Sequence, residues 1–351
     1  MTTPSRSPWA DGLGTLMGWR GLLLVLGLAL AWQALQDVPW RAVWGQLTGM
    51  TPATLLILPA LNLALLPLMT ARWWQLLRTL GVPVGLFPAC AYRFAANAVS
   101  SLTPGPHFGG EPLLVYLLHR RQEVPLPTAA TSVALDRMLE LWASLVVLSG
   151  SLILLTATNS GPFAKGWALP LAITVLTVLA TLLAALFTGR RPLSRFGAWL
   201  ARFNRTTHAD TTNRVLTAVI QGEAMAESLL QRHRRPLLLA NLCSLGHWLG
   251  VFVEFWLMAA FLGQPLSVAQ LLTVVMTARL AFLTPLPAGL GVLESALPWV
   301  TAALGLGTVL GLSLCLLIRC RDLLFSLAGL GLAMKYLTCP GKASTVANNA
   351  E

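Results

Sequence analysis

The chain has 351 residues, of which 56% are hydrophobic and only 11% are charged. Soluble domains carry charge on about a quarter of their residues, so this composition excludes a large soluble domain and indicates a polytopic membrane protein. The net charge of +11 does not point to nucleic acid, because nine of the 24 basic residues gather between Arg190 and Arg235, in a loop between apolar segments. Such a loop is expected on the cytoplasmic side, against anionic lipid headgroups.

The first half of the chain begins with a short polar segment, residues 1–12, which we expect to be cytoplasmic. A first membrane repeat follows over residues 13–158. Apolar runs between its second and third spans are too short to cross a bilayer, which takes about 20 residues, so we predict a re-entrant helical hairpin at about 87–118. The expected spans are 13–35, 52–71 and 128–156, and the second of them ends at the interfacial Arg72, Trp73 and Trp74.

The second half repeats this order over residues 165–337, with a second re-entrant hairpin at about 267–304. It includes the basic cytoplasmic loop 188–235, whose apolar stripe fits either a helix on an anionic lipid surface or a solvated linker. A polar tail, residues 338–351, is expected to be disordered. The expected spans are 167–187, 236–262 and 308–334.

A repeated motif lies at the break of each hairpin. Residues 102–111 read Leu-Thr-Pro-Gly-Pro-His-Phe-Gly-Gly-Glu, and residues 283–294 read Leu-Thr-Pro-Leu-Pro-Ala-Gly-Leu-Gly-Val-Leu-Glu. Proline and glycine at these points should end a helix. Each motif has the same frame, because Arg93 and Arg279 precede the two copies, while Arg137 and Arg321 follow the two glutamates by 26 and 27 residues.

This frame predicts an all-α polytopic membrane protein built as an inverted repeat, with three spans and one re-entrant helical hairpin in each half. Three crossings is an odd number, so the two halves should have opposite orientations, with the two proline–glycine tips near the midplane. Both termini are then cytoplasmic in the cell (inner) membrane, and the turn at 159–165 is outside.

Eleven ionisable residues fall at apparent membrane depth, where each charge costs at least about 2.5–3.5 kcal/mol unless it is paired or faces a polar cavity. Every deep cation is arginine, which grips phosphate with two parallel hydrogen bonds. Adjacent ions such as Asp136 and Arg137, or Arg321 and Asp322, point about 100° apart and should reach other helices instead. An anion site and a set of purely structural ion pairs both fit this pattern.

The substrate-binding candidates are the deep ions and the polar or small residues of the two motifs. They are Arg93, Thr103, Gly109, Gly110, Glu111, Asp136, Arg137, Arg279, Thr284, Gly289, Gly291, Glu294, Arg319, Arg321 and Asp322. Broken helix ends with free N–H groups favour an anion, and glycines permit close backbone approach. Groups that could titrate are His107, Glu140, His247 and Glu254, although a structural role fits both histidines.

Catalysis has little support in the sequence. Ser244-x-Gly246-His247 faintly resembles membrane lipid phosphatases, but those need a second histidine further on, and no histidine follows His247. The cysteines have no metal-ligand spacing, so we expect neither a metal nor a cofactor. A transporter is therefore favoured over an enzyme.

Several stretches resemble the lysylphosphatidylglycerol synthase transmembrane region, also called the flippase-like domain, of which the hopanoid-associated membrane proteins are a branch. They are Arg72-Trp73, Gly110-Glu111, Asp136-Arg137 and Pro285-x-Pro287-x-Gly289-x-Gly291-x-x-Glu294. The resemblance covers roughly residues 14–337, without the soluble synthase domain of bifunctional members. It implies movement of an aminoacylated or related phospholipid between leaflets. Where many relatives carry an arginine in the first break, this chain has His107-Phe108.

These observations together predict a flippase-like or scramblase-like transporter for a phosphate-bearing membrane lipid, with the phosphate held by Arg137, Arg279 and Arg321. Glu111 or Glu294 would exchange with the phosphate as the arginines' partner. Two alternatives stay open: a lipid-binding accessory subunit of a lipid-modifying pathway, and a polyprenyl-phosphate-dependent transferase. The protein partners left open are a second copy of the chain and a lipid-modifying enzyme.

Overall fold

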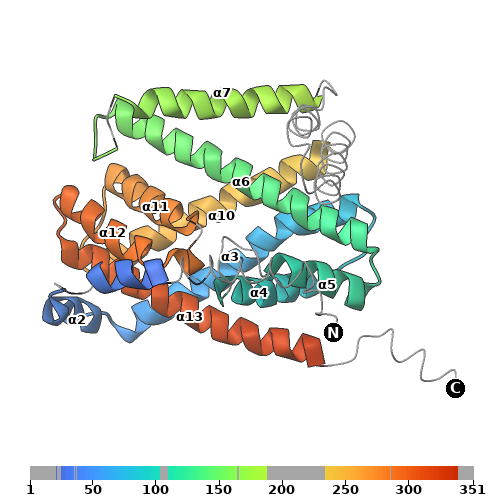
Figure 1. Cartoon of the computed structure of the whole chain (residues 1–351), viewed down its shortest axis with the longest axis horizontal. Helices are drawn as coiled ribbons and strands as arrows, with labels where there is room; N and C mark the ends of the chain where they lie inside the picture. The colour runs from blue at the N-terminus through green and yellow to red at the C-terminus, as the bar shows by residue number, and fades with distance from the viewer. Residues whose placement is uncertain are drawn as a thin grey trace, which may run out of the picture. The chain divides into compact units, whose positions relative to one another are not determined.

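The computed structural model of the chain describes residues 21, 25–34, 36, 38–102, 110–163, 166–187, 234–284 and 286–338. These residues form helices, turns and loops with no strand among them, so the all-helical fold class is confirmed (Figure 1). The predictions for residues 1–12, for almost all of the loop 188–235, for the tail from 339 and for the first motif at 103–109 lie outside the described residues.

The helices agree closely with the apolar runs of the sequence. A helix at Val25–Ala34 precedes them. The others are α2 (Trp40–Thr48), α3 (Pro52–Thr79), α4 (Leu86–Leu102), α5 (Gly110–Gln122), α6 (Leu126–Ala157), α7 (Ala168–Phe187), α10 (Arg234–Phe261), α11 (Val268–Phe282), the 3-10 turn η1 (Pro287–Gly289), α12 (Val292–Ala303) and α13 (Thr308–Thr338).

Three of the described helices are long and apolar enough to cross a membrane: α3, α6 and the part of α10 from Arg235 to Phe261. The segments Val25–Ala34, Ala168–Leu182 and Val268–Phe282 are apolar but shorter. Helix α13 has 31 residues and carries Arg319, Arg321 and Asp322 near its middle. These helices indicate a membrane location, while the count of six spans remains a prediction.

The helix starts recur with a constant offset. Each of α3, α4, α5 and α6 has a counterpart in α10, α11, α12 and α13, and the difference between the paired start residues is 182 in all four cases, as in 234 − 52 = 182 for α3 and α10. The paired helices also have similar lengths, such as 28 residues for both α3 and α10. The repeat seen in the two motifs therefore extends to the order and spacing of four helices.

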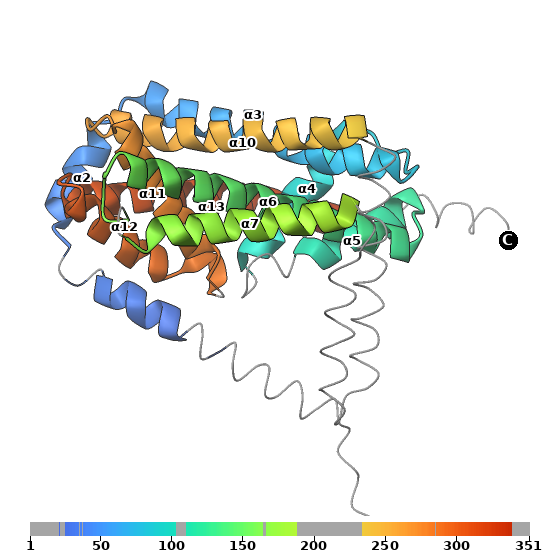
Figure 2. The same cartoon turned by 90° about the horizontal axis from the view of Figure 1, so that it is seen from above.

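Contacts divide the chain into two compact units, and each takes segments from both halves of the sequence. The first unit comprises Met1–Leu58, Ala95–Pro112 and Glu254–Ala333; the second comprises Pro59–Phe94, Leu113–Val253 and Met334–Glu351. In the second unit α6 and α7 lie side by side, as Figures 1 and 2 both show. In the first unit α11 packs against α12.

Helix α6 exposes large apolar side chains and buries several polar ones. Its large exposed side chains include Met138, Leu141, Leu145 and Leu154. Its buried residues include Asp136 and four serines, Ser132, Ser144, Ser149 and Ser151. In water this distribution would leave apolar surface uncovered, whereas in a bilayer the apolar face meets lipid and the polar face meets protein.

The second motif breaks the chain between α11 and α12 through left-handed backbone. Ala288, Gly289 and Gly291 have φ values of 49°, 64° and 83°. A Cβ atom on Gly291 would collide with the backbone oxygen of Gly27 and with Leu30, so this glycine permits the helix Val25–Ala34 to approach the break. The motif glycines were expected to permit a close approach to their backbone, and at Gly291 the segment that approaches is the helix Val25–Ala34.

Gly110 provides a first test of the hairpin geometry. It begins α5, where its N–H donates to Ser100 Oγ at 3.1 Å, and a Cβ atom there would collide with that hydroxyl and with the carbonyl of Ala96 in α4. Gly110→Ala should therefore force α4 and α5 apart and destabilise the protein by about 1–3 kcal/mol, measured as a lower unfolding temperature in detergent.

The matched control is Gly150→Ala in the exposed face of α6, where an added Cβ meets no heavy atom within 4 Å among the described residues. It should leave the unfolding temperature unchanged or raise it, because alanine is the better helix former by up to about 1 kcal/mol. Equal losses in the two variants would contradict the close packing of α4 on α5.

Candidate functional site

Polar residues form a stripe on α6 with a spacing of four: Ser132, Asp136, Glu140 and Ser144. Residues four apart on a helix share one face, so this stripe runs along one side of an apolar span. Ser132, Asp136 and Ser144 are buried. The spacing therefore turns two carboxylates of one helix toward the interior of the second unit.

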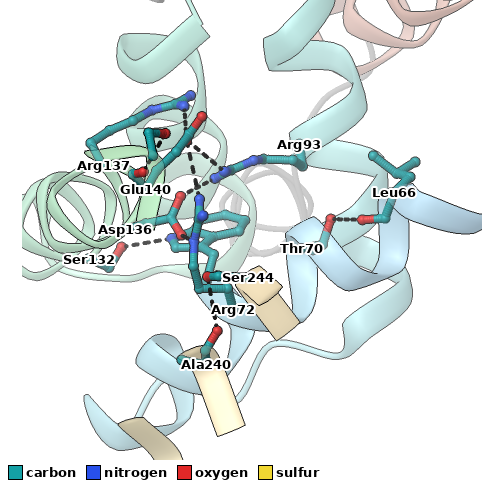
Figure 3. A network of polar contacts seen from close by, with 12 residues as sticks. Leu66, Thr70, Arg72, Arg93, Ser132, Asp136, Arg137, Glu140, Ala240 and Ser244 are labelled. Atoms are coloured by element: carbon teal, nitrogen blue, oxygen red, sulfur yellow. Dashed lines mark hydrogen bonds and ion pairs between the residues drawn. The ribbon is translucent and has the colours of Figure 1, made fainter. Parts of the chain in front are cut away.

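Two arginines from other helices reach Asp136, as Figure 3 shows. Arg72 of α3 donates from Nε to Asp136 Oδ1 at 2.7 Å, and Arg93 of α4 donates from Nη1 to Oδ2 at 2.5 Å. All three side chains are buried, and each carboxylate oxygen has its own arginine. Asp136 therefore holds α3, α4 and α6 together by charge-assisted hydrogen bonds.

Glu140, one turn further along α6, is surrounded by the same arginines and by one more. Its Oε2 accepts from Arg137 Nη1 at 2.6 Å and from Arg72 Nη2 at 3.2 Å, and it lies 3.9 Å from Arg93 Nη2. The side chains of Arg137 and Glu140 are 15% and 17% exposed, in contrast to the buried Asp136. Three guanidinium groups thus converge on one carboxylate oxygen at the accessible side of the cluster.

Arg93 has donors that Asp136 does not use. Its side chain is fully buried, with the guanidinium carbon 6.0 Å from the centroid of the Trp73 ring. Trp73 is itself fixed by an N–H donated from Nε1 to Ser132 Oγ at 3.4 Å. Within the described part of the chain, Arg93 Nε and Nη2 have no hydrogen-bond acceptor. Buried donors without an acceptor are costly, so they mark a place where a further anion would be stabilised.

A second cluster lies in the first unit. Arg321 of α13 donates from Nη1 to Glu254 Oε1 of α10 at 2.6 Å, and from Nε and Nη2 to Asp322 Oδ1 at 3.0 and 2.8 Å. The expectation that adjacent ions on a helix do not pair directly is wrong for Arg321 and Asp322, because the long arginine side chain curls back onto its neighbour. Glu254 is 2% exposed, so this pair is a buried lock between α10 and α13.

Arg319 and Glu294 fix the second motif. Arg319 donates from Nε to Glu294 Oε1 at 2.7 Å and from Nη1 to the carbonyl of Ala288 at 2.8 Å. The other oxygen of Glu294 accepts from the backbone N–H of Gly291 at 2.7 Å, which caps the start of α12. The carboxylate thus ties the left-handed turn to α13, and both of its oxygens have a structural partner.

The remaining predicted site residues are spread over both units. Gly110 and Glu111 begin α5, Arg279 lies in the last turn of α11, and His247 lies within α10. Thr284 donates from its hydroxyl to the carbonyl of Ala281. Arg137 belongs to the second unit, while Arg279 and Arg321 belong to the first. Thr103, His107 and Gly109 lie outside the described residues.

Arg72 is the site residue that the sequence interpretation missed. It was expected at the membrane interface beyond a span ending near residue 71, but α3 continues to Thr79 and Arg72 is 3% exposed. The signal that could have found it is the pair Arg72-Trp73, because both side chains contact the polar stripe of α6.

The offset of 182 residues places charged residues at equivalent positions of the paired helices. Arg137 corresponds to Arg319 and Glu140 to Asp322, with the same charges. Arg72 corresponds to Glu254, with the opposite charge. The cluster that contains Asp136 has five ions, namely three arginines and two carboxylates counting Asp136 itself. In the other half, Glu254 supplies a carboxylate at the position that corresponds to Arg72.

Comparison with known proteins identifies the family. A family model described as the lysylphosphatidylglycerol synthase TM region matches residues 19–329. The chain belongs to this family. Both ion clusters fall inside the matched region, and the resemblance inferred from the sequence motifs is confirmed.

A curated relative supports the same assignment. A UPF0104 membrane protein of Methanothermobacter thermautotrophicus (strain Delta H) is 26% identical over 289 residues, which cover 78% of this chain and 82% of that protein. The lysylphosphatidylglycerol synthase transmembrane-region family and the apolar helices together establish a membrane protein.

Proposed function

We propose that this protein moves a phosphate-bearing lipid between the two leaflets of the membrane, and that the lipid phosphate binds at the arginine cluster of Arg72, Arg93 and Arg137. The observation that carries this proposal is the convergence of their guanidinium groups on one carboxylate oxygen of Glu140, a side chain that is partly exposed. Phosphate oxygens are the ligands that such planar forks bind best. Membership of the family supports a lipid as the source of the phosphate.

The transport part of the proposal rests on the paired helices. Their constant offset supports two structurally related halves, and we infer that the halves are inverted with respect to the membrane, each with a re-entrant hairpin. In transporters of this kind one half rocks against the other around a central site, so a bound headgroup is exposed first to one leaflet and then to the other.

Transport is tested with purified protein in phospholipid vesicles without nucleotide. Labelled phosphatidylglycerol should change leaflet faster than in protein-free vesicles, while a labelled glycosylceramide, which has no phosphate, should not. Equal movement of both lipids would overturn the phosphate assignment. Movement of neither lipid would favour a lipid-binding accessory subunit, and product formation that requires an activated sugar or aminoacyl donor would favour a transferase.

The orientation is a separate prediction. We expect both termini and the loop 188–235 on the cytoplasmic side of the cell membrane, and the turn after α6 on the outside. Single cysteines at Asn159 and Ser160, placed in a variant without the native cysteines, should react with an impermeant maleimide from outside whole cells. Cysteines at the two hairpin entrances, near Gly85 and Gln264, should react from opposite sides, and reaction from the same side would contradict the inversion.

A further inference from the structure

The two carboxylates on the polar stripe of α6 are held in different ways. Asp136 is fully buried, and each of its oxygens accepts from a different arginine. Glu140 is partly exposed, and three guanidinium groups gather around one of its oxygens, Oε2. A glutamate has one more rotatable bond than an aspartate, so the carboxylate of Glu140 has the greater range of positions that it can reach.

We propose that Glu140 is an internal competitor of the substrate: its carboxylate occupies the position of a phosphate oxygen and leaves when a headgroup phosphate binds. This inference rests on the proposed function and adds the residue that regulates occupancy of the site. Because one anion replaces another, the buried arginines stay neutralised in both states. The large penalty for an unpaired buried charge is thereby avoided throughout the exchange.

The geometry gives the exchange a direction. Glu140 Oε2 accepts hydrogen bonds from Arg137 and Arg72, but it is 3.9 Å from Arg93 Nη2, too far for a hydrogen bond. A phosphate carries more acceptor oxygens in a tetrahedral arrangement than a carboxylate does. It can therefore meet Arg137 Nη1, Arg72 Nη2 and Arg93 Nη2 together, which supplies an acceptor for a buried donor that has none among the described residues.

Glu294, the carboxylate in the second motif, is less suited to this role than Glu140. Glu294 binds Arg319 with one oxygen and caps the backbone of Gly291 with the other, so its departure would undo the turn before α12. Among these carboxylates, Glu140 is the one whose departure leaves a helix junction intact, because Asp136 continues to tie α3 and α4 to α6.

The test measures binding, independently of transport. Glu140→Gln keeps the shape of the side chain but removes its charge and places an amide N–H₂ among guanidinium donors. Purified Glu140→Gln in detergent micelles should bind phosphatidylglycerol about tenfold more tightly than the unmodified protein, equal to about 1.4 kcal/mol. In vesicles it should release the lipid more slowly and so turn over less. The control is Glu123→Gln, an exposed carboxylate after α5, which should change neither quantity.

Unchanged or weaker binding of phosphatidylglycerol by Glu140→Gln would overturn the competitor role. If that variant fails to fold without lipid, Glu140→Asp provides the test instead, because its shorter side chain keeps the negative charge but holds the carboxylate further from the arginines. It should still bind severalfold more tightly, and wild-type affinity would reject the inference. If inorganic phosphate displaces phosphatidylglycerol mole for mole, the exchange of Glu140 for a phosphate would stand, but the claim that the phosphate comes from a lipid would be rejected. Tighter binding without leaflet movement would reject transport alone.

Discussion

Asp136→Asn is expected to prevent most of the protein from folding. The substitution removes the charge on which two buried arginines, Arg72 and Arg93, depend, and leaves both cations inside the second unit. Breaking a buried ion pair on one side costs about 3–5 kcal/mol, a large part of the stability of a typical domain. We therefore expect a strong loss of monodisperse protein in fluorescence-detected size-exclusion chromatography, together with a much lower unfolding temperature for the remainder.

Two comparisons make this prediction specific. The first comparison is Asp322→Asn, because Asp322 is the residue of the second half that corresponds to Glu140. Its carboxylate is 29% exposed and pairs with Arg321, so this substitution should lower the free energy of unfolding by only about 1 kcal/mol or less. Adding Arg93→Met to Asp136→Asn removes one of the stranded cations and should recover part of the folded yield. If Asp136→Asn behaves like Asp322→Asn, Asp136 is not the tie between the three helices.

The helices were predictable because their signals are local. Apolar runs with proline or glycine at their ends locate most of the helices to within a few residues, so the span expected at 128–156 is the helix Leu126–Ala157. The exception is α3, which continues to Thr79 although its span was expected to end near residue 71. The break at the second motif was predictable for the same reason, since Gly289 and Gly291 adopt positive φ there. The constant offset of 182 residues lies close to the offsets of the two motifs, whose first leucines are 181 residues apart and whose glutamates are 183 apart, but it pairs Arg137 with Arg319 and not with Arg321 as the motif frame does.

The membership of each ion cluster was not predictable, because it depends on contacts between residues far apart in the chain. Arg72 and Asp136 are separated by 64 residues, and Glu254 and Arg321 by 67. Arg72 follows an apolar run of about the right length for a complete span, which is the usual pattern of an interfacial arginine. The position of α3 against α6 decides otherwise, and the spacing of four from Ser132 to Ser144 was the local sign of a buried partner face.

The role of Glu294 also depended on atomic geometry. From the sequence, a glutamate after a glycine-rich break could equally cap a helix or exchange with a ligand. Its two oxygens bind Gly291 and Arg319, which gives it a structural role in the turn. Glu140, expected only as a group that could titrate, has the more exposed and more crowded anion position. The first motif at 103–109 lies outside the described residues, so the roles of Thr103, His107 and Gly109 remain predictions.

Arg137→Lys and Arg321→Lys should separate the binding cluster from the structural one. Arg137 is at the accessible side of its cluster, where its Nη1 meets the proposed phosphate position now held by Glu140. Lysine keeps the charge but loses the planar fork, so phosphatidylglycerol should bind about tenfold more weakly, or about 1.4 kcal/mol, while the unfolding temperature falls by no more than about 2 °C.

Arg321→Lys should have the opposite signature. Arg321 makes three hydrogen bonds to two carboxylates, and a single ammonium nitrogen cannot reproduce that geometry with both Glu254 and Asp322. The nearly inaccessible Glu254 would then lose its hydrogen bond from Arg321, at a cost of about 1–3 kcal/mol, so the loss should fall on stability more than on lipid affinity per folded molecule. Native mass spectrometry of retained lipid, paired with thermal unfolding of the same samples, measures both effects. If Arg137→Lys unfolds the protein and Arg321→Lys instead releases the lipid, the phosphate site belongs to the first unit and not to the cluster around Glu140.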